Sequence, residues 1–208
     1  HGGHHHHTVS ASTALNKAFI AGIVLNSLFV VVQAVAGFLT GSMALLSDAG
    51  HNLSDVASLV LSLLAFRLAR KRPTQSFTYG YKKSTILAAL ANAVILLVAI
   101  GMIGVESVNR LIHPHPVEGG VVAIIAGIGI LVNFGSALFF FKDKEHDLNT
   151  KGAYLHLVAD ALVSLGVVIA GLAIKYTGWY WLDGAVSIVI LITIIISTWS
   201  LLTGSLRL

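Results

Sequence analysis

The sequence predicts an all-α membrane protein, a bundle of six transmembrane helices with both termini in the cytoplasm. Of its 208 residues, 56% are hydrophobic and 11% are charged, whereas soluble domains have about 25% charged residues. Six mostly apolar segments are long enough to cross a bilayer, which takes about 20 residues. These segments are residues 14–39, 43–67, 85–108, 119–141, 151–175 and 179–202. None of the three prolines falls inside a segment, so each can form an uninterrupted helix.

The chain divides into a short tail and one large domain. Residues 1–12 begin with His-Gly-Gly-His-His-His-His, and we expect this histidine-rich tail to be disordered. It is either the remnant of a purification tag or a native segment that collects metal. Residues 13–208 then form the six-helix transmembrane domain.

The basic residues predict the orientation, because cytoplasmic loops of membrane proteins are enriched in Lys and Arg. Eleven of the thirteen Lys and Arg residues fall at the two ends of the chain and in the loops after the second and fourth segments. The opposite side has only Arg110 and Lys175. Both termini are therefore expected in the cytoplasm. The charge follows the topology and gives no reason to expect nucleic acid as a partner.

Two matched pairs of ionisable residues lie inside apolar segments. His51 and Asp55 belong to the second segment, and His156 and Asp160 belong to the fifth. A spacing of four residues places both members of a pair on one helix face. An aspartate at mid-bilayer costs about 2.5–3.5 kcal/mol by insertion scales, so two such pairs indicate a function.

The predicted topology makes the second and fifth segments antiparallel. If these helices face each other, His51 lies level with Asp160, and Asp55 lies level with His156. Two imidazole nitrogens and two carboxylate oxygens can then form a tetrahedron, the geometry that zinc adopts with these ligands. The chain has no cysteine, so thiolate ligands are excluded. The alternative is that the pairs are unrelated helix-packing contacts or parts of a proton relay.

Other polar residues have less specific interpretations. Asp48 lies on the face of His51 and is either a carboxylate or proton acceptor on the exit path or a solvated residue at the outer mouth. Glu106 and Asp183 are expected to form hydrogen bonds at helix ends and loops, and His113 and His115 to lie in an outer turn. Interhelical hydrogen bonding is the expected role of four uncharged polar residues, and the alternative is that they hold the metal ligands in place. These are Asn26, Gln33, Asn92 and Asn133.

The order of these motifs resembles the cation diffusion facilitator family, including its bacterial zinc, cobalt and cadmium efflux members and the eukaryotic zinc transporters. The resemblance begins with Ser-Asp-Ala-Gly-His-Asn-Leu-Ser-Asp at residues 47–55 and Phe-Thr-Tyr-Gly at residues 77–80. It continues with Glu106 ahead of Arg110, the segment from Asn149 to Asp160, and Trp-Leu-Asp at residues 181–183. It covers nearly the whole chain from about residue 12.

The resemblance implies a homodimer in which each subunit exports cytosolic Zn²⁺ in exchange for protons, with Co²⁺ or Cd²⁺ as possible cargo. It implies that His51, Asp55, His156 and Asp160 form the transport site, with no organic cofactor. It also implies an integral protein of the bacterial inner membrane and not an enzyme. We expect the soluble C-terminal domain usual in the family to be absent from this chain. The loop from Lys71 to Ser84 has no His, Asp, Glu or Cys, so no metal site is predicted there.

Two other functions use the same residues. A membrane-embedded zinc enzyme would hold a catalytic ion, but the chain lacks a His-Glu-x-x-His motif. A proton-coupled transporter of an organic solute would use the His/Asp pairs as a relay. Zinc binding combined with a zinc transport assay distinguishes these functions from metal efflux.

Overall fold

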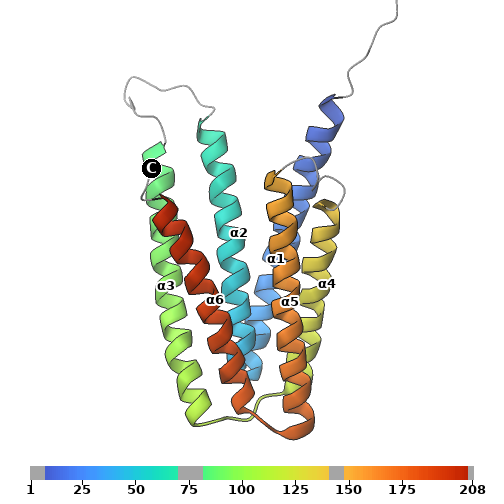
Figure 1. Ribbon diagram of the computed structural model, residues 1–208, viewed down its shortest axis with the longest axis vertical. Coiled ribbons are helices and arrows are strands. Elements are labelled where there is room, and N and C mark those ends of the chain that lie inside the picture. Colours follow the sequence, from blue (N-terminus) through green and yellow to red (C-terminus); the bar gives the residue numbers. More distant parts are fainter. Residues whose placement is uncertain (1–7, 70–81, 141–147, 206–208) are drawn as a thin grey trace, which may run out of the picture.

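Six long helices make up the computed structural model, which describes residues 8–69, 82–140 and 148–205 (Figure 1). The described residues contain no strand. The helices, in chain order, are α1 (Thr8–Thr40), α2 (Met43–Ala69), α3 (Lys82–Ile112), α4 (Gly119–Phe140), α5 (Leu148–Thr177) and α6 (Trp181–Ser205). Each helix coincides with one predicted segment, so the all-α six-helix fold class is confirmed.

Helix α1 begins earlier than the sequence predicted. It starts at Thr8, so residues 8–12, which were expected to be disordered, are helical. No Gly or Pro occurs between Thr8 and Gly22, and therefore nothing in the local sequence stops the helix from extending toward the N-terminus. The histidines of the tail lie outside the described residues.

Four of the described helices are long and apolar enough to cross a membrane, namely those containing residues 20–40, 94–112, 119–138 and 154–177. Residues 181–196 form a shorter apolar stretch in α6. Asp48, His51 and Asp55 are ionisable residues within α2, and they interrupt its apolar sequence.

Glycines in left-handed conformation end α1 and α5. Gly41 has φ 66° and follows the last residue of α1. The amide of Ser42 donates to the carbonyl of Gly37 at 3.0 Å, which is the hydrogen bond of a Schellman motif. Gly178 has φ 70°, and its amide donates to the carbonyl of Ile174 at 2.9 Å. These turns reverse the chain sharply, so α1 packs beside α2.

The helices form two groups, which are joined by α1 and by a contact between α5 and α6. Helix α2 packs against α3 and α6, whereas α4 and α5 pack against each other along their length. Helix α1 contacts both α2 and α4. Helices α2 and α5, which have the two His/Asp pairs, touch each other at few points. Any ion held by both pairs would therefore bridge the two groups.

The two ends of the bundle differ. Helix α1 begins and α6 ends at the same end, which we call the terminal end; the other is the opposite end (Figure 1). At the opposite end, glycines bring helix backbones together. A Cβ on Gly171 of α5 would lie 2.8 Å from the carbonyl oxygen of Gly119 of α4, and one on Gly184 of α6 would lie 2.7 Å from that of Ser107 of α3. These contacts leave no room for a side chain, so both helix pairs are closely packed at this end.

Among the side chains that the structure describes, one apolar core joins five helices. Its buried members come from α2, α3, α4, α5 and α6, and they include Leu45, Leu96, Val122, Val167 and Ile194. Leu45 lies at the start of α2 and Val122 at the start of α4, both at the opposite end. His51 and Asp55 lie further along α2, toward the terminal end.

Candidate metal centre

The structure brings together all four of the predicted metal ligands. His51 Nε2 lies 3.1 Å from Asp160 Oδ1, and His156 Nε2 lies 3.3 Å from Asp55 Oδ2. These are the two cross-helix pairs that the antiparallel arrangement of α2 and α5 predicts. Within each helix, His51 Nε2 lies 3.7 Å from Asp55 Oδ2, and His156 Nε2 lies 3.6 Å from Asp160 Oδ2.

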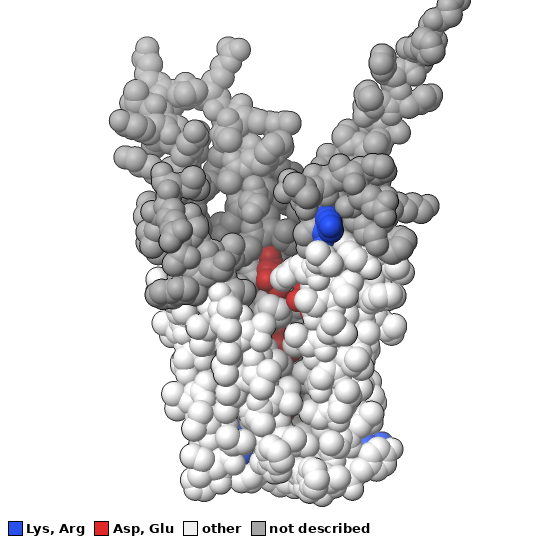
Figure 2. Space-filling view, in the orientation of Figure 1, with Lys and Arg blue, Asp and Glu red and all other residues white. Residues whose placement is uncertain are grey.

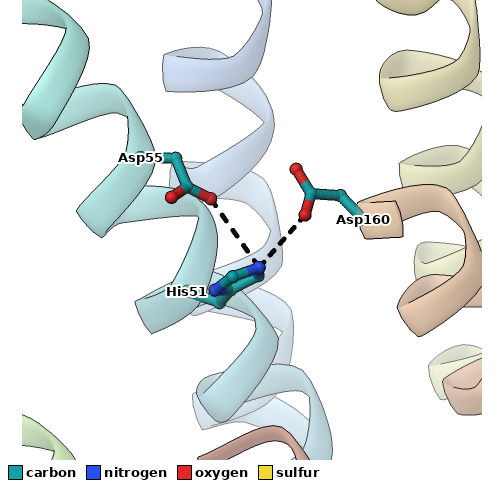
Figure 3. A group of neighbouring side chains, drawn as sticks. All are labelled: His51, Asp55 and Asp160. Atoms are coloured by element: carbon teal, nitrogen blue, oxygen red, sulfur yellow. Dashed lines mark hydrogen bonds and ion pairs between the residues drawn. The ribbon is translucent and has the colours of Figure 1, made fainter. Parts of the chain in front are cut away.

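These separations suit a tetrahedral ion. Zinc binds His nitrogen and carboxylate oxygen at about 2.0–2.2 Å, which places neighbouring ligand atoms about 3.3–3.6 Å apart. The four measured separations range from 3.1 to 3.7 Å. Ligand atoms of His51, Asp55 and Asp160 all lie within 4.8 Å of one another, and His156 lies outside this tightest group (Figure 3). His156 nevertheless faces both carboxylates, so small side-chain movements complete the ligand set.

One carboxylate oxygen of the site has no hydrogen-bond donor. Asp55 Oδ2 is a buried atom without a hydrogen-bond partner, although two imidazole nitrogens lie within 3.7 Å of it. A buried polar atom without a partner costs about 1–3 kcal/mol. A divalent cation among these nitrogens and oxygens would satisfy Asp55 Oδ2 and neutralise the two carboxylates.

Access to the site is asymmetric. The side chains of His51 and Asp160, nearer the opposite end, are 8% and 6% exposed, whereas those of Asp55 and His156, nearer the terminal end, are 26% and 48% exposed. Figure 2 shows acidic side chains recessed in a hollow between two lobes of described residues. The exposure gradient means that the site opens toward the terminal end and is closed toward the opposite end.

Asp48 lies one helical turn from His51, toward the opposite end, and is buried, with 1% exposure. The Gln33 amide nitrogen on α1 donates to Asp48 Oδ2 at 2.5 Å, and the Ser164 hydroxyl on α5 donates to the same oxygen at 3.4 Å. Asn52 Nδ2 donates to Gln33 Oε1 at 3.1 Å, which fixes which side of the Gln33 amide faces Asp48. The solvated-mouth interpretation of Asp48 is therefore wrong, because the fold encloses this carboxylate between three helices.

The predicted interhelical hydrogen bonds are found for one residue and not for two others. Gln33 links α1 to α2, as expected. Asn26 instead donates to the Gly22 carbonyl of its own helix at 3.1 Å, so that expectation is wrong. Asn133 is 1% exposed, and neither atom of its amide has a partner among the described residues. An amide can bond back to its own helix, which is why residue type alone does not predict the partner.

Asp183 joins the start of α6 to the start of α2. Its carboxylate accepts hydrogen bonds from the backbone amides of Met43 at 2.6 Å and Ala44 at 3.2 Å, and from the Ser42 hydroxyl at 2.5 Å. Ser42 in turn caps α2, since its hydroxyl accepts from the Leu45 amide at 3.2 Å. Helix-end hydrogen bonding by Asp183 is therefore confirmed, and it satisfies amides that a helix N-terminus leaves free.

Two further expectations concern the end of α3 and the connection that follows it. Glu106 was expected to form a hydrogen bond at a helix end or loop, and its carboxylate accepts one from Arg110 Nε at 2.8 Å, in the last turn of α3. His113 and His115 lie in the connection between α3 and α4, which confirms the predicted turn. The predicted absence of a metal site from residues 71–84 stays a prediction, because residues 70–81 lie outside the described residues.

Sequence reasoning missed two polar groups. One is Asn52, whose position next to His51 in the sequence was the available signal. The other is a hydroxyl chain in which Ser187 of α6 contacts both Ser47 of α2 and Ser107 of α3. Serines in apolar helices are common, so nothing in the sequence marked these three as neighbours. They link α2, α3 and α6 into one unit on the opposite-end side of the site.

Comparison with known proteins identifies the class. The family model described as the cation efflux transmembrane domain matches residues 19–208, and the chain belongs to this cation efflux family. This confirms the resemblance to cation diffusion facilitators. The chain is an integral membrane protein with several apolar helices.

Named relatives cover almost the whole chain. It is 40% identical over 206 residues to the zinc transporter ZitB of Escherichia coli and 37% identical over 207 residues to the cadmium, cobalt and zinc/H⁺-K⁺ antiporter of Bacillus velezensis. It is 35% identical over 185 residues to the metal cation efflux system protein CzcD of Cupriavidus metallidurans. The matches to ZitB, the Bacillus antiporter and CzcD cover 98%, 99% and 89% of this chain. They cover 66%, 66% and 58% of the three relatives, so the chain spans slightly less than two thirds of the relatives' length.

Proposed function

We propose that this protein exports Zn²⁺ from the cytoplasm in exchange for protons, by alternating access to the site of His51, Asp55, His156 and Asp160. The observation that carries the proposal is the convergence of two nitrogens and two carboxylates from two helices at separations of 3.1 to 3.7 Å. The printed names of the relatives, a zinc transporter and a cadmium, cobalt and zinc antiporter, support the same cargo.

The ligand set suits zinc because it combines neutral imidazole with carboxylate. Two ionised carboxylates and two neutral imidazoles carry a charge of −2, which a divalent cation cancels. Co²⁺ and Cd²⁺ also bind imidazole, whereas Mg²⁺ and Mn²⁺ favour sites made only of oxygen. The chain therefore offers a site for zinc-like metals as transported cargo.

Proton exchange follows from the same four side chains. Metal binding requires neutral imidazole and ionised carboxylate, so protons and metal compete for the site. Protons that occupy the empty site reduce its unbalanced negative charge in the membrane, where an unpaired charge is costly. One site can thus accept metal in one direction and protons in the other.

The direction of export is supported by the distribution of charge and by access. In the sequence, eleven of the thirteen basic residues fall at the two ends of the chain and in the connections that follow α2 and α4, which the positive-inside rule assigns to the cytoplasm. The site opens toward that end, as the exposure of Asp55 and His156 indicates. Both observations support an inward-open state from which metal is loaded. We place the protein in the bacterial inner membrane, with both termini cytoplasmic, and infer from the family resemblance that it acts as a homodimer.

The test measures zinc uptake into inverted membrane vesicles with an imposed proton gradient. We expect uptake to require the gradient and to be lost in Asp55→Ala, because that change removes a ligand. Glu106→Gln is the matched control, since Glu106 is a carboxylate that pairs with Arg110 away from the site. Uptake that ignores the gradient, or that survives in Asp55→Ala, would contradict the proposal.

A further inference from the structure

Asn133 and Ser136 of α4 are buried polar residues that the transport mechanism described above does not use. Each is 1% exposed. Among the described residues, the Asn133 amide nitrogen, its oxygen and the Ser136 hydroxyl have no hydrogen-bond partner. A buried amide without partners is costly, and intramembrane polar groups usually find a partner on a neighbouring helix. The helix that faces α4 most extensively is α5.

The register between α4 and α5 places Asn133 level with Asp160. A Cβ on Gly129 of α4 would lie 2.8 Å from the Phe29 ring of α1 and 3.2 Å from the Ser164 hydroxyl of α5, so this face of α4 points between α1 and α5. The helices are antiparallel, and a side chain four residues further along a helix lies on the same face, one turn on. One turn along α4 from Gly129 is Asn133, and one turn back along α5 from Ser164 is Asp160. The side chains of Asn133 and Asp160 therefore start from adjacent faces of α4 and α5, at the same depth in the bundle.

Asp160 needs a new donor once metal is bound. In the structure, Asp160 Oδ1 pairs with His51, and Asp160 Oδ2 lies 3.6 Å from His156. Both imidazole Nε2 atoms bind the ion in the loaded site and no longer face the carboxylate as donors. If one oxygen of Asp160 binds the metal, the other is left without these partners. Carboxylate ligands of metals are normally held by such a donor outside the coordination sphere.

We propose that Asn133 is a positioning residue for zinc, whose amide N–H donates to the oxygen of Asp160 that does not bind the metal. The proposal rests on the proposed transport site and deepens it. Ser136, three residues further along α4, is placed to donate its hydroxyl to the Asn133 oxygen. This bond orients the NH₂ group toward α5, as Asn52 orients the Gln33 amide toward Asp48.

The other amides near this level are already committed. Gln33 bonds to both Asp48 and Asn52, and Asn26 donates to a carbonyl of its own helix. Among the described residues, Asn133 is therefore the buried amide without a partner in the packed region between α4 and α5. The match between a free donor and an oxygen that loses its donors on metal binding is the basis of the assignment.

The test measures zinc affinity by isothermal titration calorimetry of the full chain in lipid nanodiscs, together with KM and kcat for zinc transport in proteoliposomes. Asn133→Leu keeps the side-chain size but removes the amide, and we expect zinc affinity to fall about 10- to 100-fold. KM should rise correspondingly while kcat at saturating zinc changes little, which a merely structural defect would not produce. Asn133→Gln, which keeps the amide, should recover part of the affinity, and Ser136→Ala should show a smaller loss.

Asn26→Leu is the matched control, because the amide of Asn26 bonds within its own helix, and it should bind zinc like the unmodified chain. If Asn133→Leu does not accumulate in membranes, Asn133→Ala replaces it with the same expectation. Unchanged affinity in the folded Asn133 variant, or an equal loss in Asn26→Leu, overturns the role of Asn133. Failure of the unmodified chain to bind zinc would instead overturn the transport site itself.

Discussion

At the scale of single residues, His51 is a buried imidazole that contacts the carboxylates of both ligand helices. Its Nε2 atom lies between Asp55 and Asp160, and its side chain is 8% exposed (Figure 3). The identity of this one residue determines whether the site has two nitrogens or one. Since nitrogen ligands separate zinc-like metals from those that prefer oxygen, His51 is the natural position at which to alter selectivity.

We predict that His51→Asp shifts the preference of the transporter toward Mn²⁺ and Cd²⁺. The substitution gives a site with three carboxylates and one imidazole, and the additional oxygen favours the larger or harder ions relative to zinc. Competition of each metal against zinc uptake in vesicles measures the shift, which should be at least severalfold.

His115→Asp is the control for this selectivity experiment, because His115 lies in the connection between α3 and α4, away from the site. It should leave the order of metals unchanged. A His51→Asp variant that transports zinc with the original order of preference would show that the imidazole does not set selectivity.

The residue-scale predictions from sequence succeeded where the signal was local. The i, i+4 spacing in α2 and α5 fixes which side chains share a face, so the His51–Asp160 and Asp55–His156 pairs followed once the helices were known to be antiparallel. The partners of Asp48 and Asn133 depend instead on how α1 and α4 rotate about their axes. That rotation is set by packing over the whole bundle, and no spacing within one helix reveals it.

At the scale of helices, the contact between α4 and α5 depends on glycine. A Cβ on Gly171 would lie 2.8 Å from both the Gly119 carbonyl oxygen and the Ala123 amide nitrogen. Backbone atoms of a helix cannot move aside easily, so a side chain at this position must separate the two helices. Small residues serve this purpose in membrane bundles, where helices gain stability from close packing and not from the exclusion of water.

We predict that Gly171→Val lowers the free energy of unfolding by about 1–3 kcal/mol, which is the usual range for overpacking a tight contact. Gly166→Val, on the same helix, is the matched control, because a Cβ on Gly166 meets no atom within 4 Å. Unfolding in mixed micelles with increasing denaturing detergent measures the difference. Equal stability of the two variants would show that the α4–α5 backbones can separate without loss.

Helix positions were largely predictable because each span is a long apolar segment with turn residues at its ends. Gly41 and Gly178, both with positive φ, lie directly after α1 and α5. The start of α1 was not predictable from composition, because a histidine-rich tail suggests disorder while the following residues have no helix breaker. The cap that Asp183 provides to α2 joins residues about 140 positions apart, which no local pattern could show.

At the scale of the whole molecule, the two ligand helices belong to different groups of the bundle. Helices α2 and α5 touch at few points, while α2 is linked to α3 and α6 and α5 to α4. An ion coordinated by both pairs would pull the two groups toward each other at the terminal end. The glycine contacts at the opposite end hold partners within each group, so the groups can move as units.

We predict that zinc shortens the distance between α2 and α5 at the terminal end. The chain has no cysteine, so Val60→Cys and Leu155→Cys, both at exposed positions, can be spin-labelled without other changes. Double electron–electron resonance should show a shorter mean distance with saturating zinc than without metal. Ile128→Cys with Ile169→Cys, on α4 and α5, is the control pair and should not change, since these helices move together. No zinc-dependent change between α2 and α5 would contradict this movement.

We also predict that zinc affinity falls as the pH is lowered. The bound state needs two neutral imidazoles and two ionised carboxylates. Acid adds protons to the free site and therefore favours release, so the apparent dissociation constant should rise as the pH is lowered. Calorimetric titration in buffers of different ionisation enthalpy measures both this change and the number of protons released. Affinity independent of pH would contradict competition between metal and protons.

The link between Asp183 and the start of α2 also bears on how the protein is made. Helix α2 is synthesised early, yet the carboxylate that accepts hydrogen bonds from its Met43 and Ala44 amides arrives only with α6, about 140 residues later. A nascent chain that has inserted α2 thus still has uncapped amides at the base of the helix that holds His51 and Asp55. The metal site is therefore complete only once α6 has been inserted, and a chain interrupted before α6 would have half of its ligands on a helix that lacks this cap.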